Sequence, residues 1–351
     1  MTAGCLPEEL MMDILTRLPV KSLVRFECIH KSWNSLIKSF DFVITHSQNP
    51  KNRTHGSIFV AYYDHDSGNM FFRSLAPNSF DVRADLVIPS IIKQQYMIRS
   101  SCNGLLCLCN YDPCRILLYN PCLNQYKILP TSNLYHMTLS ELFGFGYDST
   151  NNDYKVVREL LSWDWEQVPR RITEVYSLRR NSWRKLGSNI IPDDIRLCGG
   201  IGFVSDSLFN GAIHRLAYYS RNNNRAGMIV SFDVCNEEFH MFSRPNLKGC
   251  NADLKISVNR DLLSIFDLAF QVRDEVCCDI WVMKEYGVED SWYEDVSDDD
   301  EEGRGYSLPG PDLPSRYRVT NYEAIKTIVL AASDKALYPV PLCSKGGASL
   351  L

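Results

Sequence analysis

The amino-acid sequence predicts a multidomain fold of α and β structure, in which a small N-terminal unit of three helices precedes a larger, all-β domain. Two observations predict this division. Residues 6–44 contain no glycine, and their apolar side chains recur at the three- and four-residue spacing of helices. From about His55 that spacing disappears, and short β-rich stretches alternate with Asn, Asp, Gly, Ser and Pro turns. A chain of 351 residues has the length expected for two domains.

Composition and charge narrow the class of protein. Hydrophobic residues make up 45% and charged residues 23%, which is the balance of a folded rather than a disordered chain. The formal net charge of −5 argues against nucleic-acid binding, which needs basic surfaces to neutralise phosphates. We find no basic-then-apolar signal segment, and no apolar run near the roughly 20 residues of a membrane span. We therefore expect a cytoplasmic or nuclear protein.

Three short helices are expected at the N-terminal end. Glu8 and Glu9 suit a first helical turn because carboxylates favour the positive end of the helix dipole. This helix is expected to end at Pro19. A second helix is expected over residues 21–28, and Ser32 is expected to cap a third. Apolar residues stand at every fourth position of the first helix: Leu10, Ile14 and Leu18.

These helices carry more apolar surface than so small a unit can bury. Of the 39 residues from Leu6 to Ile44, 20 are apolar. A unit of this size has too little interior to be stable without disulfides, metal or a partner. Each exposed Leu, Ile or Phe that reaches a partner surface gains roughly 1.5–3 kcal/mol. The pattern predicts a docking element; the alternative is a helical cap folded onto the chain's own second domain.

An aromatic pattern recurs through the β-rich region. Three pairs of aromatic residues stand seven positions apart: Tyr119 and Tyr126, Tyr176 and Trp183, and Phe232 and Phe239. Trp281 and Trp292 resemble a fourth copy whose hairpin is lengthened around Gly287. A gap of seven suits a hairpin that places two rings on one sheet face. Its repetition every 50-odd residues (about the length of one blade) predicts a propeller of four-stranded blades; the alternative is a β-sandwich with accidental spacing.

The cysteines and histidines do not indicate a metal or disulfide site. The chain has 13 cysteines, an odd number, without a secretory signal. None of the gaps in the densest cluster has the spacing of a zinc knuckle. We expect buried free thiols at that cluster, which comprises Cys102, Cys107, Cys109, Cys114 and Cys122.

No catalytic motif is found. A phosphate-binding loop is absent, and Gly199, Gly200 and Gly202 lack the setting of a dinucleotide fingerprint. The seven histidines are scattered without ligand spacing, and no nucleophile elbow occurs. We therefore expect no catalytic residue, no cofactor and no metal. The alternative function class is a propeller-type enzyme with an N-terminal helical cap, which would have no reason to expose the N-terminal apolar surplus.

The first helices also resemble a known motif. Residues 6–10, 14–23 and 31–37 (LPEEL, ILTRLPVKSL and KSWNSLI) closely resemble the F-box in order and spacing. The resemblance implies three helices that bind the Skp adaptor, which in turn bridges to a cullin scaffold. It further implies that ten residues form or support that contact: Leu6, Pro7, Ile14, Leu15, Leu18, Pro19, Leu23, Val24, Phe26 and Trp33.

The β-rich region supports the same resemblance. Residues 101–107, 118–121, 144–148, 152–157 and 279–288 look like the kelch-like F-box-associated domain of plant F-box proteins. That resemblance implies a propeller-like domain of about five or six blades. Within this group the motif sequences are similar to those of the S-locus-like F-box branch, which implies targets such as the ribonucleases of pollen self-incompatibility.

The domain boundaries follow from these segments. We expect an F-box over residues 1–48, an F-box-associated domain over 49–292, an acidic Gly/Pro-rich flexible segment over 293–315 and a divergent C-terminal segment over 316–351. Five adjacent carboxylates at 298–302 predict a solvated segment; the alternative is that they dock a basic partner. The departure from the family pattern there predicts an incomplete last blade.

The function implied is that of a non-catalytic substrate-recognition adaptor in an SCF-type ubiquitin ligase, which promotes ubiquitination and degradation of a target protein. Target specificity is expected in loops on one propeller face, over residues 162–166 and 218–225. Within them, Trp163, Trp165 and Tyr218 are the candidate substrate contacts. The alternative is that these loops pack as a lid on their own sheet.

Overall fold

The described structure is a set of ranges from a computed structural model of the chain. They are residues 7–37, 39, 42, 45–46, 57–64, 69–75, 82–85, 96–110, 115–121, 124–132, 138–163, 169–187, 191–198, 206–219, 227–245, 253–259, 261–270, 276–294 and 329–333. The chain divides into two compact units, Met1–Leu129 with Ile328–Leu351, and Pro130–Thr327. In the described ranges, no helix has the length and apolar character needed to cross a membrane.

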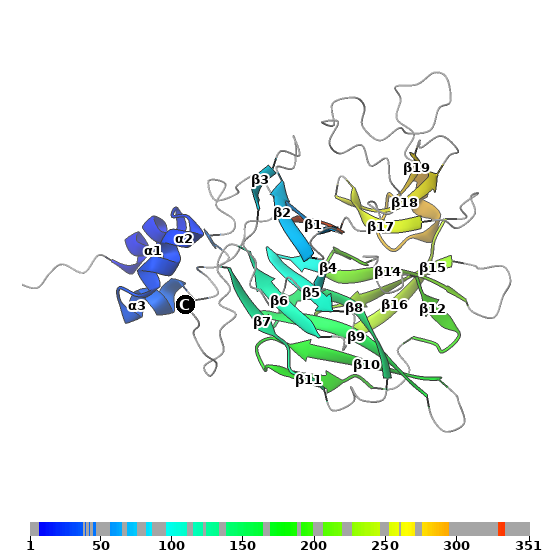
Figure 1. The fold of residues 1–351 in the computed structure, drawn as a ribbon, viewed down its shortest axis with the longest axis horizontal. Coiled ribbons are helices and arrows are strands. Elements are labelled where there is room, and N and C mark those ends of the chain that lie inside the picture. The colour runs from blue at the N-terminus through cyan, green and yellow to red at the C-terminus, as the bar shows by residue number, and fades with distance from the viewer. Residues whose placement is uncertain are drawn as a thin grey trace, which may run out of the picture. The chain divides into compact units, whose positions relative to one another are not determined.

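The three predicted N-terminal helices are present (Figure 1): α1 Glu8–Thr16, α2 Val20–Glu27 and α3 Lys31–Ile37. A proline precedes each of the first two helices, and its carbonyl starts the helical hydrogen bonding. The Pro7 carbonyl accepts from the Leu10 and Met11 amides at 3.0 and 3.1 Å. Pro19 does the same for α2, since its φ of −60° already suits the helix and its missing N–H is not needed there.

The start of α3 differs from the prediction. Ser32 does not cap this helix, because the helix begins one residue earlier and includes Ser32 in its first turn. The His30 ring provides the acceptor instead: the Ser32 amide donates to His30 Nδ1 at 3.2 Å. A histidine in this position was not foreseen because Ser is by far the commoner capping residue.

The helices share a small core of their own. Its buried members come from α1, α2, α3 and the residues beyond it: Leu15, Leu23, Ile37 and Phe42. At its edge the Phe26 and Trp33 rings meet edge to face, with centroids 5.5 Å apart. His46 is also buried, and its Nε2 lies 2.8 Å from the Leu18 carbonyl.

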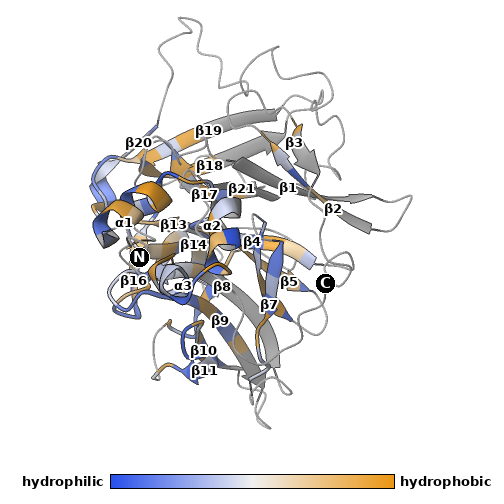
Figure 2. Ribbon diagram, turned by 90° about the vertical axis from the view of Figure 1, so that its left-hand side faces the viewer, coloured by the Kyte–Doolittle hydropathy of each residue, from blue (hydrophilic) through white to orange (hydrophobic). Residues whose placement is uncertain are grey.

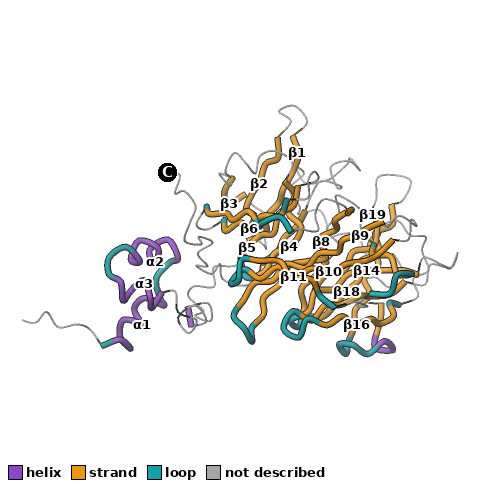
Figure 3. Tube along the Cα trace, turned by 90° about the horizontal axis from the view of Figure 1, so that it is seen from below, coloured by secondary structure: helices purple, strands orange, loops and turns teal. Residues whose placement is uncertain are grey.

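Strands make up almost all of the described chain after α3 (Figure 3). In the first unit they form two antiparallel sheets, ordered β21-β1-β2-β3 and β4-β5-β6-β7. The bounds are β1 Ser57–Asp64, β2 Asn69–Leu75, β3 Val82–Asp85, β4 Tyr96–Cys102, β5 Leu105–Asn110, β6 Ile116–Asn120, β7 Gln125–Ile128 and β21 Val329–Ser333.

The second unit contains three further antiparallel sheets in the described ranges. Their orders are β8-β9-β10-β11, β12-β14-β15-β16 with β13 also on β14, and β17-β18-β19-β20. The bounds are β8 Thr138–Asp148, β9 Asp153–Trp163, β10 Pro169–Ser177, β11 Ser182–Lys185, β12 Ile195–Leu197, β13 Asp206–Phe209, β14 Ala212–Tyr219, β15 Gly227–Asp233, β16 Glu238–Ser243, β17 Asp253–Asn259, β18 Leu262–Phe270, β19 Val276–Met283 and β20 Trp292–Glu294. This series of four- and five-stranded antiparallel sheets confirms the predicted propeller-like β class.

One strand joins its sheet from the far end of the chain. β21 pairs with β1, with Ser57 opposite Ser333 and Ala61 opposite Val329. The C-terminal segment, which we expected to diverge from the family pattern, thus supplies the fourth strand of the first sheet.

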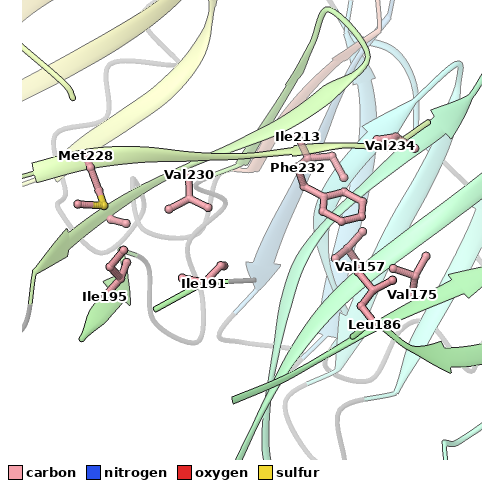
Figure 4. Packing of buried hydrophobic residues seen from close by; sticks show 11 residues of the cluster. Val157, Val175, Leu186, Ile191, Ile195, Ile213, Met228, Val230, Phe232 and Val234 are labelled. Carbon is pink, nitrogen blue, oxygen red and sulfur yellow. The ribbon is translucent and has the colours of Figure 1, made fainter. Parts of the chain in front are cut away.

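The sheets of the second unit pack face to face (Figure 4). The β14 strand shows why these sequences lack a simple polar–apolar alternation. Its Ile213 belongs to the cluster shared with β9, β10 and β15, whereas Leu216 belongs to a second cluster shared with β17, β18 and β19. A strand covered on both faces must be apolar on both.

Two glycines let β8 approach β14 and the β15–β16 turn closely. A Cβ at Gly144 would lie 2.4 Å from the Ile213 Cγ2, and one at Gly146 would lie 2.7 Å from the Val234 Cγ2. Real Cβ atoms do not come this close, so the Gly-Phe-Gly sequence is explained by packing between sheets.

The aromatic repeat has the geometry that its spacing predicts. In three hairpins the two aromatics are direct cross-strand partners: Tyr119 with Tyr126, Tyr176 with Trp183, and Phe232 with Phe239. The fourth expected pair was wrong in register. Trp292 faces Met283 rather than Trp281, because the β19–β20 connection contains the 3₁₀ turn Glu289–Ser291 and shifts the pairing by two residues.

Candidate protein-docking site

Two of the exposed apolar side chains of the helical unit lie on one face of α1. Leu10 is 51% exposed and Ile14 is 49% exposed. With Pro7 they stand at i, i+3 and i+7, which places all three on the same side of the helix. In Figure 2 the orange parts of α1 mark its hydrophobic residues. We call Pro7, Leu10 and Ile14 the α1 face.

The structure separates the ten predicted adaptor-contact residues into classes that the sequence could not distinguish. Leu15 and Leu23 are core residues of the helical unit, at 2% and 0% exposure. Leu18, Phe26 and Trp33 are partly buried against that core.

The remaining predicted contact residues are either exposed to solvent or lie outside the described residues. Pro7, Ile14 and Pro19 are exposed. Val24 lies in α2, but its side chain and the whole of Leu6 lie outside the described structure.

Two exposed apolar residues were missed as contact candidates. Leu10 completes the α1 face, and Ile29 is 60% exposed just after α2. The four-residue spacing of Leu10 and Ile14 predicted a helix but not which side of it faces solvent. That distinction depends on how α1 packs against α2 and α3, which a local pattern does not contain.

The predicted target-contact residues lie at equivalent places in two sheets. Trp163 ends β9, and Tyr218 lies near the end of β14. Each of these strands is the second of its sheet and leads into the connection to the third. Tyr218 is half-buried, and the neighbouring Tyr219 is 40% exposed. The Trp163 side chain and Trp165 lie outside the described structure. Their role as target contacts stays a prediction.

A buried charge cluster lies between the β8–β9 and β15–β16 hairpins. The Lys155 Nζ lies 2.6 Å from Asp148 Oδ2 and 2.8 Å from Glu237 Oε1. It also donates to the Val234 carbonyl at 2.8 Å. Three ammonium protons therefore meet three acceptors, which is how a buried lysine avoids an unpaired charge. Arg184 forms a further ion pair with Glu237.

The electrostatics of Asp148 follow from this cluster. Burial favours the neutral carboxyl and by itself would raise the pKa. Hydrogen bonds from Lys155 and Asn151 outweigh burial and lower the pKa of Asp148 to about 2. Asp148 is therefore ionised at every physiological pH, and its charge stabilises the folded state.

A polar pair of the buried His214 and the more exposed Tyr286 connects β14 to the β19–β20 hairpin. His214 Nδ1 lies 3.2 Å from the Ser207 carbonyl, and Nε2 lies 2.8 Å from the Tyr286 hydroxyl. A carbonyl can only accept, so Nδ1 carries the proton and Tyr286 donates to Nε2. Burial lowers the pKa of His214 to about 4, which keeps the ring neutral.

A third buried set lies within the β8–β11 sheet. Arg158 Nη2 lies 2.7 Å from Glu174 Oε2, and the Ser132 hydroxyl donates to Glu174 Oε1 at 2.8 Å. The Arg158 guanidinium stands 4.0 Å from the centroid of the Trp183 ring. The charges of Arg158 and Glu174 are thus engaged with each other and with neighbouring side chains, which is a structural role.

Three of the five clustered cysteines lie in the described ranges, and they have the buried position that we expected. Cys102, Cys107 and Cys109 are buried and unbridged, whereas Cys114 and Cys122 lie outside the described residues. The described ranges contain no group of three or more His, Cys, Asp or Glu side chains placed to hold a metal ion.

Comparison with protein families accounts for both parts of the chain. Residues 4–45 match the F-box domain, and residues 57–309 match the F-box associated beta propeller domain. The chain belongs to the plant F-box proteins with an F-box-associated domain.

Relatives of this F-box protein in Arabidopsis thaliana cover most of its length. The F-box/kelch-repeat protein At3g23880 is 29% identical over 305 residues, which cover 82% of this chain and 78% of the relative. The F-box protein CPR1 is 28% identical over 309 residues, covering 82% and 71%. The F-box protein At3g07870 is 27% identical over 325 residues, covering 83% and 72%. Among solved structures, the match to TolB from Acinetobacter baumannii covers 67% of this chain and 54% of the TolB chain. The sequence identity is 8% and the TM-score is 0.34.

Proposed function

We propose that this F-box protein is the substrate-recognition subunit of an SCF-type ubiquitin ligase. In this role the F-box binds a Skp adaptor, and through it a cullin scaffold, while the β-domain binds a target protein. The observation that supports this proposal best is the α1 face. Its Leu10 and Ile14 side chains are about half exposed although the helical unit has a completed core of its own. Apolar side chains left outside a finished core mark a protein contact.

The proposed mechanism is proximity, without chemistry performed by this chain. A receptor that holds a target beside a charged ubiquitin-conjugating enzyme raises the effective concentration of the target lysine. The charged residues buried in the second unit support a non-catalytic role, because Asp148, Lys155, Arg158 and Glu174 are each engaged in an ion pair. We expect the protein in the cytoplasm or nucleus.

The α1 face provides a direct test. Ile14→Glu places a charge where the adaptor contact would bury an apolar side chain, and burial of such a side chain contributes roughly 1.5–3 kcal/mol. We expect adaptor affinity to fall at least about tenfold. The measurement is titration of a purified plant Skp adaptor with the full chain by isothermal calorimetry.

Two further variants make this test specific. Val258→Glu replaces another exposed aliphatic residue, 38% exposed on β17, and should leave adaptor affinity unchanged. Leu15→Ala removes a core side chain and should lower the unfolding temperature, whereas Ile14→Glu should not. Full adaptor affinity in a folded Ile14→Glu variant would rule out the α1 face as the contact.

A further inference from the structure

The repeated hairpins allow equivalent positions in different sheets to be compared within one molecule. The outer hairpin of each sheet, formed by its third and fourth strands, has a common backbone plan but a different charge. The β15–β16 hairpin, residues 233–243, contains three carboxylates and no Lys or Arg. The β19–β20 hairpin contains Lys284 and four carboxylates, and the β6–β7 hairpin contains Lys127 alone.

The β10–β11 hairpin is the exception. Residues 177–185 contain four cations and no carboxylate: Arg179, Arg180, Arg184 and Lys185. The β6–β7 and β15–β16 hairpins pair their strands across turns of the same length without these residues, so the fold does not require them. A chain with a net charge of −5 has thus concentrated positive charge on one hairpin. We call these four residues the basic hairpin.

The four cations are presented to solvent. All four are exposed, and Arg184 is 48% exposed. They lie on the turn and on β11, which is the outermost strand of its sheet (Figure 1). Charged residues on an outer strand also prevent edge-to-edge pairing, but that explanation does not apply to Arg179 and Arg180, which lie in the turn.

Most of this charge is not neutralised by the chain in the described structure. Arg184 pairs with Glu237, and that carboxylate is shared with the buried Lys155. The Arg179 guanidinium donates only to the Asn151 carbonyl, at 3.2 Å. Within the described ranges, Arg180 and Lys185 make no side-chain hydrogen bond or ion pair.

The turn that carries these cations is rigidly held. The Arg179 amide donates to Asp153 Oδ1 at 2.8 Å, and the Arg180 amide donates to the Ser177 hydroxyl at 3.0 Å. Backbone fixed by such side-chain caps presents its charged groups in one geometry, which reduces the entropy lost on binding.

We propose that the basic hairpin is a docking surface for an acidic segment of a partner protein. Guanidinium and ammonium groups without internal counter-ions complement carboxylates, and Arg provides paired donors to them. A protein partner is favoured over nucleic acid because the cations are confined to one short hairpin of a chain whose net charge is −5, whereas a nucleic acid needs an extended basic surface to neutralise its phosphates. This surface belongs to the second unit of the chain, whereas the proposed adaptor contact belongs to the first.

The test measures binding of a fluorescein-labelled peptide of alternating Glu and Ser to the full chain by fluorescence anisotropy. Arg180→Glu with Lys185→Glu reverses the two charges that have no internal contact, so the fold should be kept. We expect its affinity for the peptide to fall about tenfold or more, because like charges across a contact repel. Arg180→Lys with Lys185→Arg should bind as the parent does, and Lys284→Glu on the equivalent β19–β20 hairpin should have no effect.

Other outcomes would overturn the proposal. Equal affinity of the parent and the Arg180→Glu, Lys185→Glu variant would show that the basic hairpin is not the site. A single-stranded oligonucleotide that binds as tightly as the Glu–Ser peptide would replace the acidic protein segment with nucleic acid. Titration of the Skp adaptor with the same variant should give the parent affinity, which distinguishes failure of this surface from failure of the proposed function.

Discussion

Lys155 shows how one buried residue can join two hairpins through its charge. Its side chain is 7% exposed, and its ammonium group meets Asp148, Glu237 and the Val234 carbonyl. Removing either carboxylate would leave a buried positive charge only partly compensated, and such a loss is costly in a low-dielectric interior. The cluster connects two hairpins more than 80 residues apart in the sequence, so its loss would weaken the contact between two sheets.

We expect the free energy of unfolding to fall as the pH drops from about 4 to about 2, with Asp148 as a main contributor. The pKa of Asp148 is lowered to about 2 in the folded state. Below pH 4 the unfolded carboxylate binds a proton before the folded one does, so acid favours unfolding. This contribution, about 2 kcal/mol in full, is present above pH 4 and is lost as the pH passes through about 2. Urea unfolding at a series of pH values measures it.

Asp148→Asn removes the titrating group and tests this assignment. The variant should be less stable than the parent at pH 7 by about 2 kcal/mol, and the difference should shrink toward pH 2. Asp290→Asn, at an exposed carboxylate of the β19–β20 connection, should leave the pH profile unchanged. A constant difference between the Asp148→Asn variant and the parent at all pH values would contradict the assignment.

At the scale of the element, the hairpins share a tyrosine–asparagine contact that the aromatic spacing did not reveal. Tyr176 donates to Asn181 Oδ1 at 2.8 Å, and Tyr147 donates to Asn152 Oδ1 at 2.8 Å. Each asparagine has a positive φ, 53° and 49°, in the left-handed region where Asn is favoured among non-glycine residues. The asparagine therefore both makes the turn and accepts the hydroxyl.

In the β15–β16 hairpin, both the tyrosine and the asparagine of this contact are absent. Phe232 replaces the tyrosine, and Glu237 stands at the turn position with a φ of 60°. Because both members are replaced, no buried hydroxyl is left without an acceptor. Replacing both partners of a hydrogen bond costs less free energy than replacing only one. Glu237 instead provides the carboxylate that Lys155 needs.

We predict an energetic coupling of about 1 kcal/mol between Tyr176 and Asn181, the ordinary net value of one hydrogen bond. A double-mutant cycle of Tyr176→Phe and Asn181→Gly measures it by urea unfolding, since glycine keeps the positive φ and removes only the acceptor. The same cycle at Tyr147 and Asn152, where the bond is exposed to solvent, should give a smaller coupling. Strictly additive single-variant effects at Tyr176 and Asn181 would refute the claim.

The elements also show which features could be predicted from sequence. Aromatic pairing in the hairpins was predictable because it depends on a short turn and on strand alternation, both local. The Trp281 and Trp292 register was missed because their connection contains a 3₁₀ turn that changes the count. The core role of Leu15 and the charges around Lys155 were not predictable, because their partners are set by packing between distant segments. The target-contact prediction for Trp163, Trp165 and Tyr218 remains open for the same reason.

At the scale of the whole molecule, the pairing of β1 with β21 makes the first sheet depend on the end of the chain. We expect that removal of residues 326–351 increases amide hydrogen exchange over residues 57–61, which face β21. Their edge would then resemble that of a three-stranded sheet with exposed backbone groups. Exchange followed by mass spectrometry at peptide level is the measurement.

A matched change nearby separates this effect from a general loosening of the C-terminal region. Replacing the five carboxylates at 298–302 by the corresponding amides keeps the chain length and leaves β21 in place. This variant should exchange over residues 57–61 at the parent rate. If truncation leaves that rate unchanged as well, β21 does not protect β1.

The same pairing has a consequence for biosynthesis. A ribosome releases β1 long before it translates β21, and at ordinary elongation rates the interval is on the order of tens of seconds. During that interval α1, α2 and α3 have already emerged, and the described residues of their small core lie between Met12 and His46. On the proposed function, the nascent polypeptide would be able to bind its adaptor while the β-domain is still unfinished, and a chaperone that shields the unpaired β1 edge would raise the yield of folded protein.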